Sequence, residues 1–249
     1  MRHSRFGALF ERQSYKILRD SLAASGAALR PADKLQTHQQ ALVREVQACA
    51  RCARMQCSRR VLTERNGPWD AKVMFVAEAP GRLGAEVTGV PLFGDRTGDR
   101  FEELLRAMRW NRRDVFITNA VLCNPRNEAG NNDVPTRAEI LNCSEFLRRT
   151  IAAVEPVLVV ALGRIALDAL KLIHQHNLSL QKSAGAIEPW AGRNLGVLYH
   201  PGPRTVVHRR WQDQIADACK IAQNSVALLE GDGGARFSAR TAQEATPAI

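Results

Sequence analysis

The chain has 249 residues, which suits one α/β domain with additional segments or two small domains. Apolar residues make up 45% of it, and no apolar run is long enough to cross a bilayer, so we expect no membrane contact. The N-terminus lacks the apolar stretch of a signal peptide, so we expect a cytoplasmic protein. The 35 Lys and Arg outnumber the 25 Asp and Glu, and the formal charge of +10 favours a polyanionic partner.

The two ends of the chain differ in composition from its middle. Residues 1–35 are rich in Arg and predict a basic helical extension that breaks near Pro31. Residues 231–249 are rich in Gly, Ala and Thr and predict a disordered tail. A single α/β domain is therefore expected over residues 36–230, beginning with a helix over residues 36–48.

The chain has six cysteines, and three of them lie close together, at Cys49, Cys52 and Cys57. A cytosolic protein has little use for disulfides, so clustered cysteines indicate metal or redox chemistry. The Cys49-Ala50-Arg51-Cys52 pair brings two thiolates to one centre, and by itself it fits zinc, an iron–sulfur cluster or a redox pair.

Four short apolar runs predict buried strands, at residues 73–76, 115–123, 157–163 and 195–199. Helical patterns separate them, including one that begins with a capping box at Thr136 and Glu139 and one over residues 209–229. Residues 175–194 predict irregular structure, either a hairpin or a loop around Trp190. Strands that alternate with helices predict a three-layer α/β/α fold with a central, mainly parallel four-stranded sheet.

Three polar residues fall at or near the carboxyl ends of predicted strands, namely Glu78, Asn119 and His200. Open α/β sheets place ligands in a crevice at this edge, so the three side chains are expected to converge. For Glu78 the alternative is a carboxylate that only braces a turn. For Asn119, a buried amide that must be hydrogen-bonded, the alternative is a tie between two loops.

Several motifs, taken in order, resemble the uracil-DNA glycosylase superfamily and most closely its iron–sulfur family 4 branch. Glu78-Ala79-Pro80-Gly81 is similar to the first motif, and Gly89-Val90-Pro91-Leu92-Phe93-Gly94 to the loop that carries a stacking Phe. Ile117-Thr118-Asn119 followed by Cys123-Asn124-Pro125 resembles the strand with the uracil-reading Asn. His200-Pro201-Gly202-Pro203 resembles the second catalytic motif.

The resemblance extends to the cysteines. The family's cluster takes a Cys-x-x-Cys pair before the first strand, one Cys just after the Asn strand and one on the next helix. Cys49, Cys52, Cys123 and Cys143 occupy those places. The resemblance therefore implies a [4Fe–4S] cluster, with zinc as the alternative and Cys57 as a spare thiol.

The resemblance implies roles for the remaining site residues. Glu78 and His200 would be catalytic, and Ala79, Gly81, Phe93 and Asn119 would form the base pocket. A basic segment after the last strand, comprising Arg204, His208, Arg209 and Arg210, would hold DNA phosphates or would alternatively be the solvated start of a helix.

The sequence also departs from the family pattern. Ala79 replaces the water-activating Asp of other branches, Gly81 replaces a Tyr that excludes thymine, and Gly202 stands where Ser is usual. Glu86 is an approximate match to a Glu that screens out thymine in the iron–sulfur branch. A reactive His insertion found in a covalent DNA-capturing branch is not evident.

The resemblance implies a monomeric, monofunctional glycosylase that removes uracil from DNA, is associated with the nucleoid when bound, and leaves an abasic site. Two alternatives remain open. One is a glycosylase for another deaminated base, such as hypoxanthine or xanthine. The other is an iron–sulfur protein that binds DNA without turnover.

Overall fold

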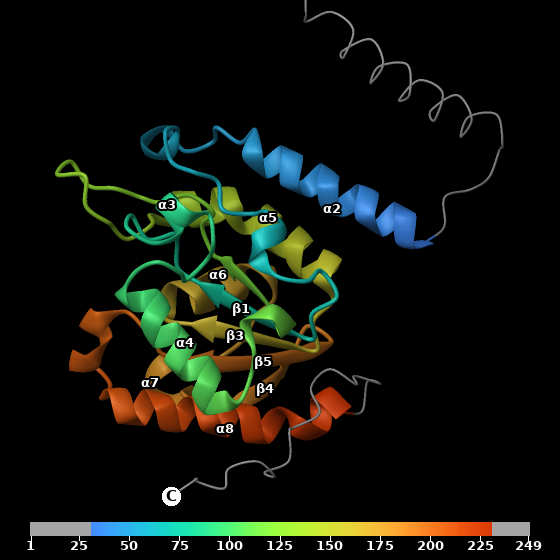
Figure 1. The fold of residues 1–249 in the computed structure, drawn as a ribbon, viewed down its shortest axis with the longest axis vertical. Helices are drawn as coiled ribbons and strands as arrows, with labels where there is room; N and C mark the ends of the chain where they lie inside the picture. The colour runs from blue at the N-terminus through green and yellow to red at the C-terminus, as the bar shows by residue number, and fades with distance from the viewer. Residues whose placement is uncertain (1–30, 231–249) are drawn as a thin grey trace, which may run out of the picture. The chain divides into compact units, whose positions relative to one another are not determined.

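The computed structural model describes residues 31–230, with side chains from residue 36, so the extension expected over 1–35 and the tail over 231–249 lie largely outside the described residues. Contacts divide the chain into the units Met1–Gln39 and Gln40–Ile249, and the sheet lies in the second. Its elements follow in chain order (Figure 1): α2 (Pro31–Gln47), β1 (Val73–Ala77), α3 (Ala85–Thr88), α4 (Arg96–Met108), β2 (Val115–Asn119), α5 (Arg137–Val154), β3 (Leu158–Leu162), α6 (Arg164–Ile173), α7 (Leu180–Ser183), β4 (Ile187–Trp190), β5 (Arg193–Leu198) and α8 (Trp211–Glu230).

The sheet has five strands in the order β2-β1-β3-β5-β4, and all neighbouring pairs are parallel except β4 with β5. The prediction of a mainly parallel sheet is confirmed, but the count of four strands is wrong. The missed strand, β4, contains Glu188 and Pro189, both exposed at the edge of the sheet. Proline is tolerated on an edge strand but hides the strand pattern in the sequence.

Strand β4 and strand β5 form a hairpin, which is one of the two structures expected around Trp190. The turn residues Ala191 and Gly192 both have positive φ, at 50° and 73°, as the tight turns of two-residue hairpins require. Strand β2 ends at Asn119, earlier than the predicted residue 123. Beyond it, Ala120 N and Val121 N still donate to the carbonyl oxygens of Ala77 and Glu78, so the two chain segments stay together past the strand ends.

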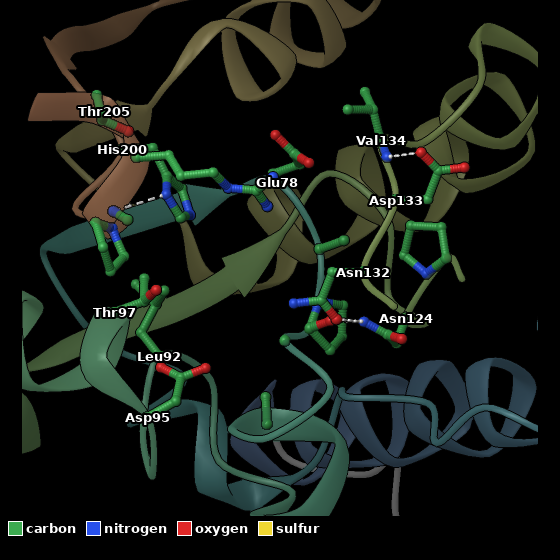
Figure 2. Close-up of a pocket in the computed structure, with 18 residues that line it drawn as sticks. Glu78, Leu92, Asp95, Thr97, Asn124, Asn132, Asp133, Val134, His200 and Thr205 are labelled. Carbon is green, nitrogen blue, oxygen red and sulfur yellow. Dashed lines mark hydrogen bonds between the residues drawn. The ribbon is translucent and has the colours of Figure 1, made fainter. Parts of the chain in front are cut away.

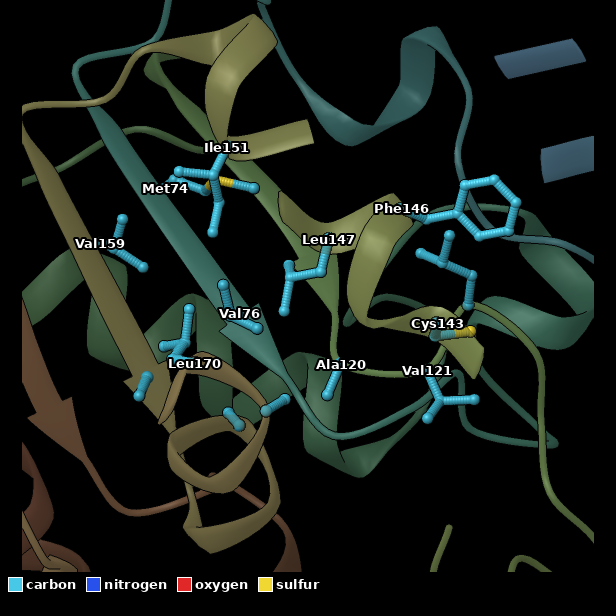
Figure 3. Close-up of a cluster of buried hydrophobic side chains, with 14 of the residues drawn as sticks. Met74, Val76, Ala120, Val121, Cys143, Phe146, Leu147, Ile151, Val159 and Leu170 are labelled. Atoms are coloured by element: carbon cyan, nitrogen blue, oxygen red, sulfur yellow. The ribbon is translucent and has the colours of Figure 1, made fainter. Parts of the chain in front are cut away.

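Helices cover both faces of the sheet, as the three-layer prediction requires (Figure 1). On one face Met74, Val76 and Val159 pack against Leu147, Ile151 and Leu170 of α5 and α6 (Figure 3). On the other face Phe75 and Val160 belong to a second cluster with residues of α4 and α8. Strands β1 and β3 are buried throughout, which explains their uninterrupted apolar sequences.

Two helix starts bear on the predictions. The capping box of α5 is present, because Thr136 accepts from Glu139 N and the Glu139 carboxylate accepts from Thr136 N. Pro31 begins α2, a position that proline tolerates because the first helical N–H has no partner inside the helix; the break expected near Pro31 involves residues outside those described. Between residues 31 and 230, no helix combines the length and apolarity that a bilayer crossing needs.

Candidate active site and cysteine cluster

A cavity of about 380 Å³ opens at the carboxyl ends of the strands, and it brings Glu78 and His200 together (Figure 2). Glu78 follows β1 and His200 follows β5 by two residues. Strand β1 has β2 on one side and β3 on the other, so the chain changes direction across the sheet at this point. Such a switch point leaves a crevice beside the strand ends, which places the cavity where the fold predicts it.

The imidazole of His200 has a defined tautomer. Gly202 N donates to its Nδ1 at 3.0 Å, so in the neutral ring the proton resides on Nε2. Burial lowers the pKa of His200 to about 4, although the charge of Asp95 acts in the opposite direction. His200 is therefore neutral at physiological pH and offers one N–H donor.

Gly163 and Gly202 make room for this ring. A Cβ at Gly202 would lie 2.9 Å from His200 Nδ1, and a Cβ at Gly163 would lie 3.0 Å from His200 Cβ. The glycine that this chain has at position 202, where the family pattern has Ser, is therefore compatible with the observed position of His200.

Glu78 is a half-buried carboxylate on the same cavity. Burial raises its pKa above the ordinary value, and the charges of Arg164 and Arg204 partly oppose this rise. A carboxylate whose pKa is raised beside a neutral histidine is a common arrangement in catalytic sites.

Asn119 lies at the end of β2, where its Cα pairs with that of Ala77. It is 2% exposed and is not among the residues that line the cavity. Its Nδ2 has no hydrogen-bond partner among the described residues, and a buried amide donor without a partner costs about 1–3 kcal/mol. The structure thus places an unsatisfied donor at the strand end next to the turn that carries Glu78, although not on the surface of the cavity.

The loop before α4 turns Leu92, not Phe93, toward the cavity. Leu92 lines it in a left-handed conformation with φ of 48°. Arg112 Nη1 donates to Pro91 O and Nη2 donates to Leu92 O, at 2.9 and 2.7 Å, and these bonds hold the loop backbone. Phe93, the predicted stacking residue, is 48% exposed, and its ring centroid lies 5.8 Å from the Arg112 guanidinium carbon.

Other predicted pocket residues fall in two groups. Ala79 and Gly81 line the cavity with Glu78, as expected. Glu86 does not line it: one carboxylate oxygen accepts from Arg59 N and pairs with Arg126, and the other is buried without a partner among the described residues.

The predicted DNA-binding residues also divide. Arg204 lines the cavity, and His208 lines an adjoining one. Arg209 is engaged by the buried carboxylate of Asp217 through two hydrogen bonds of 2.7 Å, and Arg210 pairs with Asp213 at 3.1 Å. The last two arginines therefore have partners within the helix that follows.

Sequence reasoning missed several polar residues of the cavity wall, among them Asp95, Asn124 and Asn132. Asn124 Nδ2 donates to Pro80 O at 2.5 Å and to Asn132 Oδ1 at 2.9 Å, which braces the turn after β1 (Figure 2). Asp95 is the N-cap of α4 and accepts from Gly98 N. An Asp just before a helical pattern is a helix-capping signal, so the sequence indicates that Asp95 begins the helix. It does not indicate that the Asp95 side chain lines the cavity.

The four cysteines expected to share a centre do line one small cavity, of about 20 Å³, together with Arg60 and Asn142. Burial first, and then the neighbouring cysteines, raise the pKa of Cys123 to about 12 and that of Cys143 to about 11. Thiols that raise one another's pKa in this way lose their protons when they bind a metal, because the positive charge of the metal stabilises the thiolates. Cys57 is exposed and lies outside this cavity.

The donor set can be compared with the two metal centres weighed from the sequence. Four thiol side chains around one cavity are the donor set of a [4Fe–4S] cluster, in which the cysteines bind different irons. Zinc requires its ligands to converge tetrahedrally on one point. Four Cys thiols are also a common donor set of structural zinc sites, so the types of side chain present fit either group.

Comparison with known proteins agrees with this geometry. The family profile described as uracil DNA glycosylase superfamily matches residues 64–223. A type-4 uracil-DNA glycosylase of Archaeoglobus fulgidus is 32% identical over 166 residues, covering 64% of this chain and 79% of that protein. A type-4 enzyme of Thermotoga maritima is 33% identical over 157 residues, covering 63% and 77%. A type-4 enzyme of Saccharolobus solfataricus is 33% identical over 163 residues, covering 63% and 72%. The chain therefore belongs to the uracil-DNA glycosylase superfamily.

Proposed function

We propose that the protein hydrolyses the N-glycosidic bond of deoxyuridine in DNA and leaves an abasic site, as a step of DNA repair. The observation that carries the proposal is the convergence of Glu78 and a neutral His200 in one cavity. A base stacked in a duplex cannot reach such a cavity, so the nucleotide must be rotated out of the helix.

In the reaction the bond between C1′ and N1 breaks, and its electron pair moves into the uracil ring. The oxygen of a water adds to C1′, and the proton that this water loses ends on the released uracil. The Nε2–H of His200 donates to O2 of the uracil, where the negative charge develops. The Asn119 amide pairs with the N3–H and O4 edge, which satisfies its buried Nδ2 donor and disfavours cytosine.

Glu78 acts on the sugar side. Its carboxylate stabilises the positive charge that develops at C1′ and orients the attacking water. The described part of the cavity wall contains no lysine that could form a Schiff base, which supports a monofunctional enzyme. One chain supplies both Glu78 and His200, which supports an enzyme that acts as a monomer.

We also propose that Cys49, Cys52, Cys123 and Cys143 hold a [4Fe–4S] cluster, which joins the segment before the sheet to β2 and α5. Bound there, the cluster would supply a covalent crosslink between these segments.

A panel of labelled oligonucleotides tests the proposal. Each carries one uracil, hypoxanthine, xanthine or mismatched thymine, in single- and double-stranded form, and alkali reveals abasic sites. We expect multiple turnover on uracil. Turnover only on hypoxanthine or xanthine would reassign the base, and binding without abasic product from iron-loaded protein would make this a non-catalytic DNA-binding protein.

A further inference from the structure

The cavity that holds Glu78 and His200 is the middle one of three hollows. On one side it shares Asp95, Thr97, Asn132 and Arg204 with a hollow of about 550 Å³, which we call the Arg82 hollow. On the other side it shares Glu78, Val134, His200 and Thr205 with a hollow of about 460 Å³, which we call the Arg164 hollow. The three hollows therefore form a continuous trough.

The Arg82 hollow is lined by arginines that have no ion-pair partner among the described residues. Arg82, Arg96 and Arg204 line it, and none of them forms an ion pair within residues 31–230. Asp95 is the one carboxylate in the described lining, and one of its oxygens is already bonded to Gly98 N. Three guanidinium groups against one carboxylate leave an excess of positive charge in this hollow.

The Arg164 hollow has no such excess of positive charge, because the carboxylate of Glu78 lines it beside one arginine. Arg164 and His208 line it with the polar side chains of Gln181, Tyr199 and Thr205. Arg164 pairs with Asp168 at 3.0 Å, but both side chains are more than half exposed, so this pair contributes little and can exchange.

Two of the three arginines expected from the sequence to hold phosphates contrast with these. Arg209 and Arg210 have carboxylate partners on α8, and the bonds of Arg209 reach a fully buried Asp217. Breaking such a pair would leave an uncompensated buried charge, so a phosphate competes poorly for Arg209. Arg210, whose pair with Asp213 is exposed like that of Arg164 with Asp168, stays available to a polyanion but does not line the trough.

We infer that the DNA strand carrying the target nucleotide runs along this trough, with the nucleotide in the middle cavity and its flanking phosphates in the two outer hollows. Arg82 and Arg96 bind the phosphate on one side, Arg164 and His208 bind the one on the other, and Arg204 lies at the boundary with the Arg82 hollow. This inference rests on the proposed function, because it takes the middle cavity as the site of the flipped nucleotide. It adds Arg82, Arg96 and Arg164 as residues that bind DNA.

The inference is tested by binding of three single-stranded oligonucleotides, with a 2′-fluorinated deoxyuridine whose glycosidic bond resists cleavage. One has flanks on both sides of that nucleotide, one only a 5′ flank and one only a 3′ flank. On the first, we expect the Arg82→Ala/Arg96→Ala double variant and Arg164→Ala each to raise Kd about tenfold. The slope of log Kd against log salt should fall by about 0.7 for each phosphate that the variant no longer neutralises.

The truncated oligonucleotides give the decisive comparison. The double variant should match the wild type on one of them and remain weakened on the other, and Arg164→Ala should show the opposite pattern. Arg148→Ala is the matched control, because Arg148 is an exposed arginine paired with Glu145 on α5, away from the trough, and it should leave Kd unchanged throughout. Melting curves show whether each variant is folded.

Equal effects of both variants on both truncated oligonucleotides, or no effect of either, would overturn the inference. Because this assay measures binding to DNA that is not cleaved, it is independent of turnover. Absence of uracil release by the wild type would refute the proposed function but not the path of the strand. The opposite responses of the two variants to the truncated oligonucleotides test only that path.

Discussion

Glu78 and His200 face the same cavity, but burial acts on their protonation in opposite directions. It raises the pKa of the Glu78 carboxyl and lowers that of the His200 imidazole to about 4. At neutral pH the site therefore contains a neutral imidazole, beside a carboxyl group that keeps its proton to a higher pH than an ordinary glutamate does. A neutral imidazole can donate its Nε2–H to a developing oxyanion, and no cation has to be kept buried in the cavity before the base arrives.

The pH dependence of kcat/KM should report on Glu78. As pH falls through its raised pKa the carboxylate becomes protonated, so we expect the rate to fall at a pH above the ordinary pKa of a glutamate. His200 stays neutral over that range, so it adds no second step.

The variant Glu78→Gln provides the control for this assignment. It should lower the plateau rate about 100-fold and abolish the acidic limb. An acidic limb that persists unchanged in Glu78→Gln would assign that titration to another group.

A second prediction concerns the wall that contacts the base. Because Arg112 holds the loop with Leu92 turned inward, Leu92→Ala should lower kcat/KM about tenfold, whereas Phe93→Ala should change it less than about twofold. Steady-state kinetics on uracil-containing DNA measures both. A larger loss in Phe93→Ala would mean that DNA rearranges the loop and brings the phenylalanine onto the base.

At the scale of elements, one arginine connects three segments near the site. Arg54, in the turn after Cys52, donates to both carboxylate oxygens of Glu139 at the start of α5, at 2.6 and 2.7 Å. It also donates to Asp133 Oδ2 at 2.7 Å and to Val134 O at 3.0 Å. Asp133 and Val134 line the active-site cavity, so the cysteine segment and the cavity wall are joined through this guanidinium.

The variant Asp133→Asn tests whether this connection positions the wall. It removes the ion pair to the wall but leaves the pair of Arg54 with Glu139, which anchors α5. We expect KM for DNA to rise about threefold with kcat and iron content unchanged. Amides of residues 126–134 should exchange with solvent faster.

The matched comparison is again Arg148→Ala, which removes an exposed ion pair on α5 that does not touch the wall. Unchanged KM and unchanged amide exchange in Asp133→Asn would show that the wall keeps its position without Arg54.

At the scale of the whole molecule, the cysteines connect residues distant in sequence. Cys123→Ser or Cys143→Ser should lose iron and lower the melting temperature, because both thiols line the cavity shared with Cys49 and Cys52. Cys57→Ser should keep its iron and its melting temperature, since Cys57 is exposed and lies outside that cavity. Iron assays and melting curves measure this, and full iron content in Cys143→Ser would refute the ligand assignment.

The buried strands and the strand-end residues were predictable because each depends on local sequence. Val73 to Val76 could be buried on both faces only in a covered parallel sheet, and Glu78 follows directly. Strand β4 was not predictable, because an edge strand with Glu188 and Pro189 lacks an apolar pattern.

The inward turn of Leu92 was not predictable either. It depends on hydrogen bonds from Arg112 and on a positive φ, and neither can be read from the loop's own sequence. The same holds for Arg209, whose partner Asp217 lies two turns further along the chain on a face that only the packed structure defines.

The most direct test of the proposed chemistry is the amount of free uracil released from DNA by the wild type and by Asn119→Ala. Asn194→Ala, the same substitution at the opposite end of the sheet, is the control. We predict multiple turnover by the wild type and the control. In Asn119→Ala we predict that the rate of uracil release falls at least about 100-fold, because the pocket loses the side chain that hydrogen-bonds to the base. Equal release of uracil by Asn119→Ala and the wild type would contradict the assignment of Asn119, and no release by any of the three would contradict the proposed function itself.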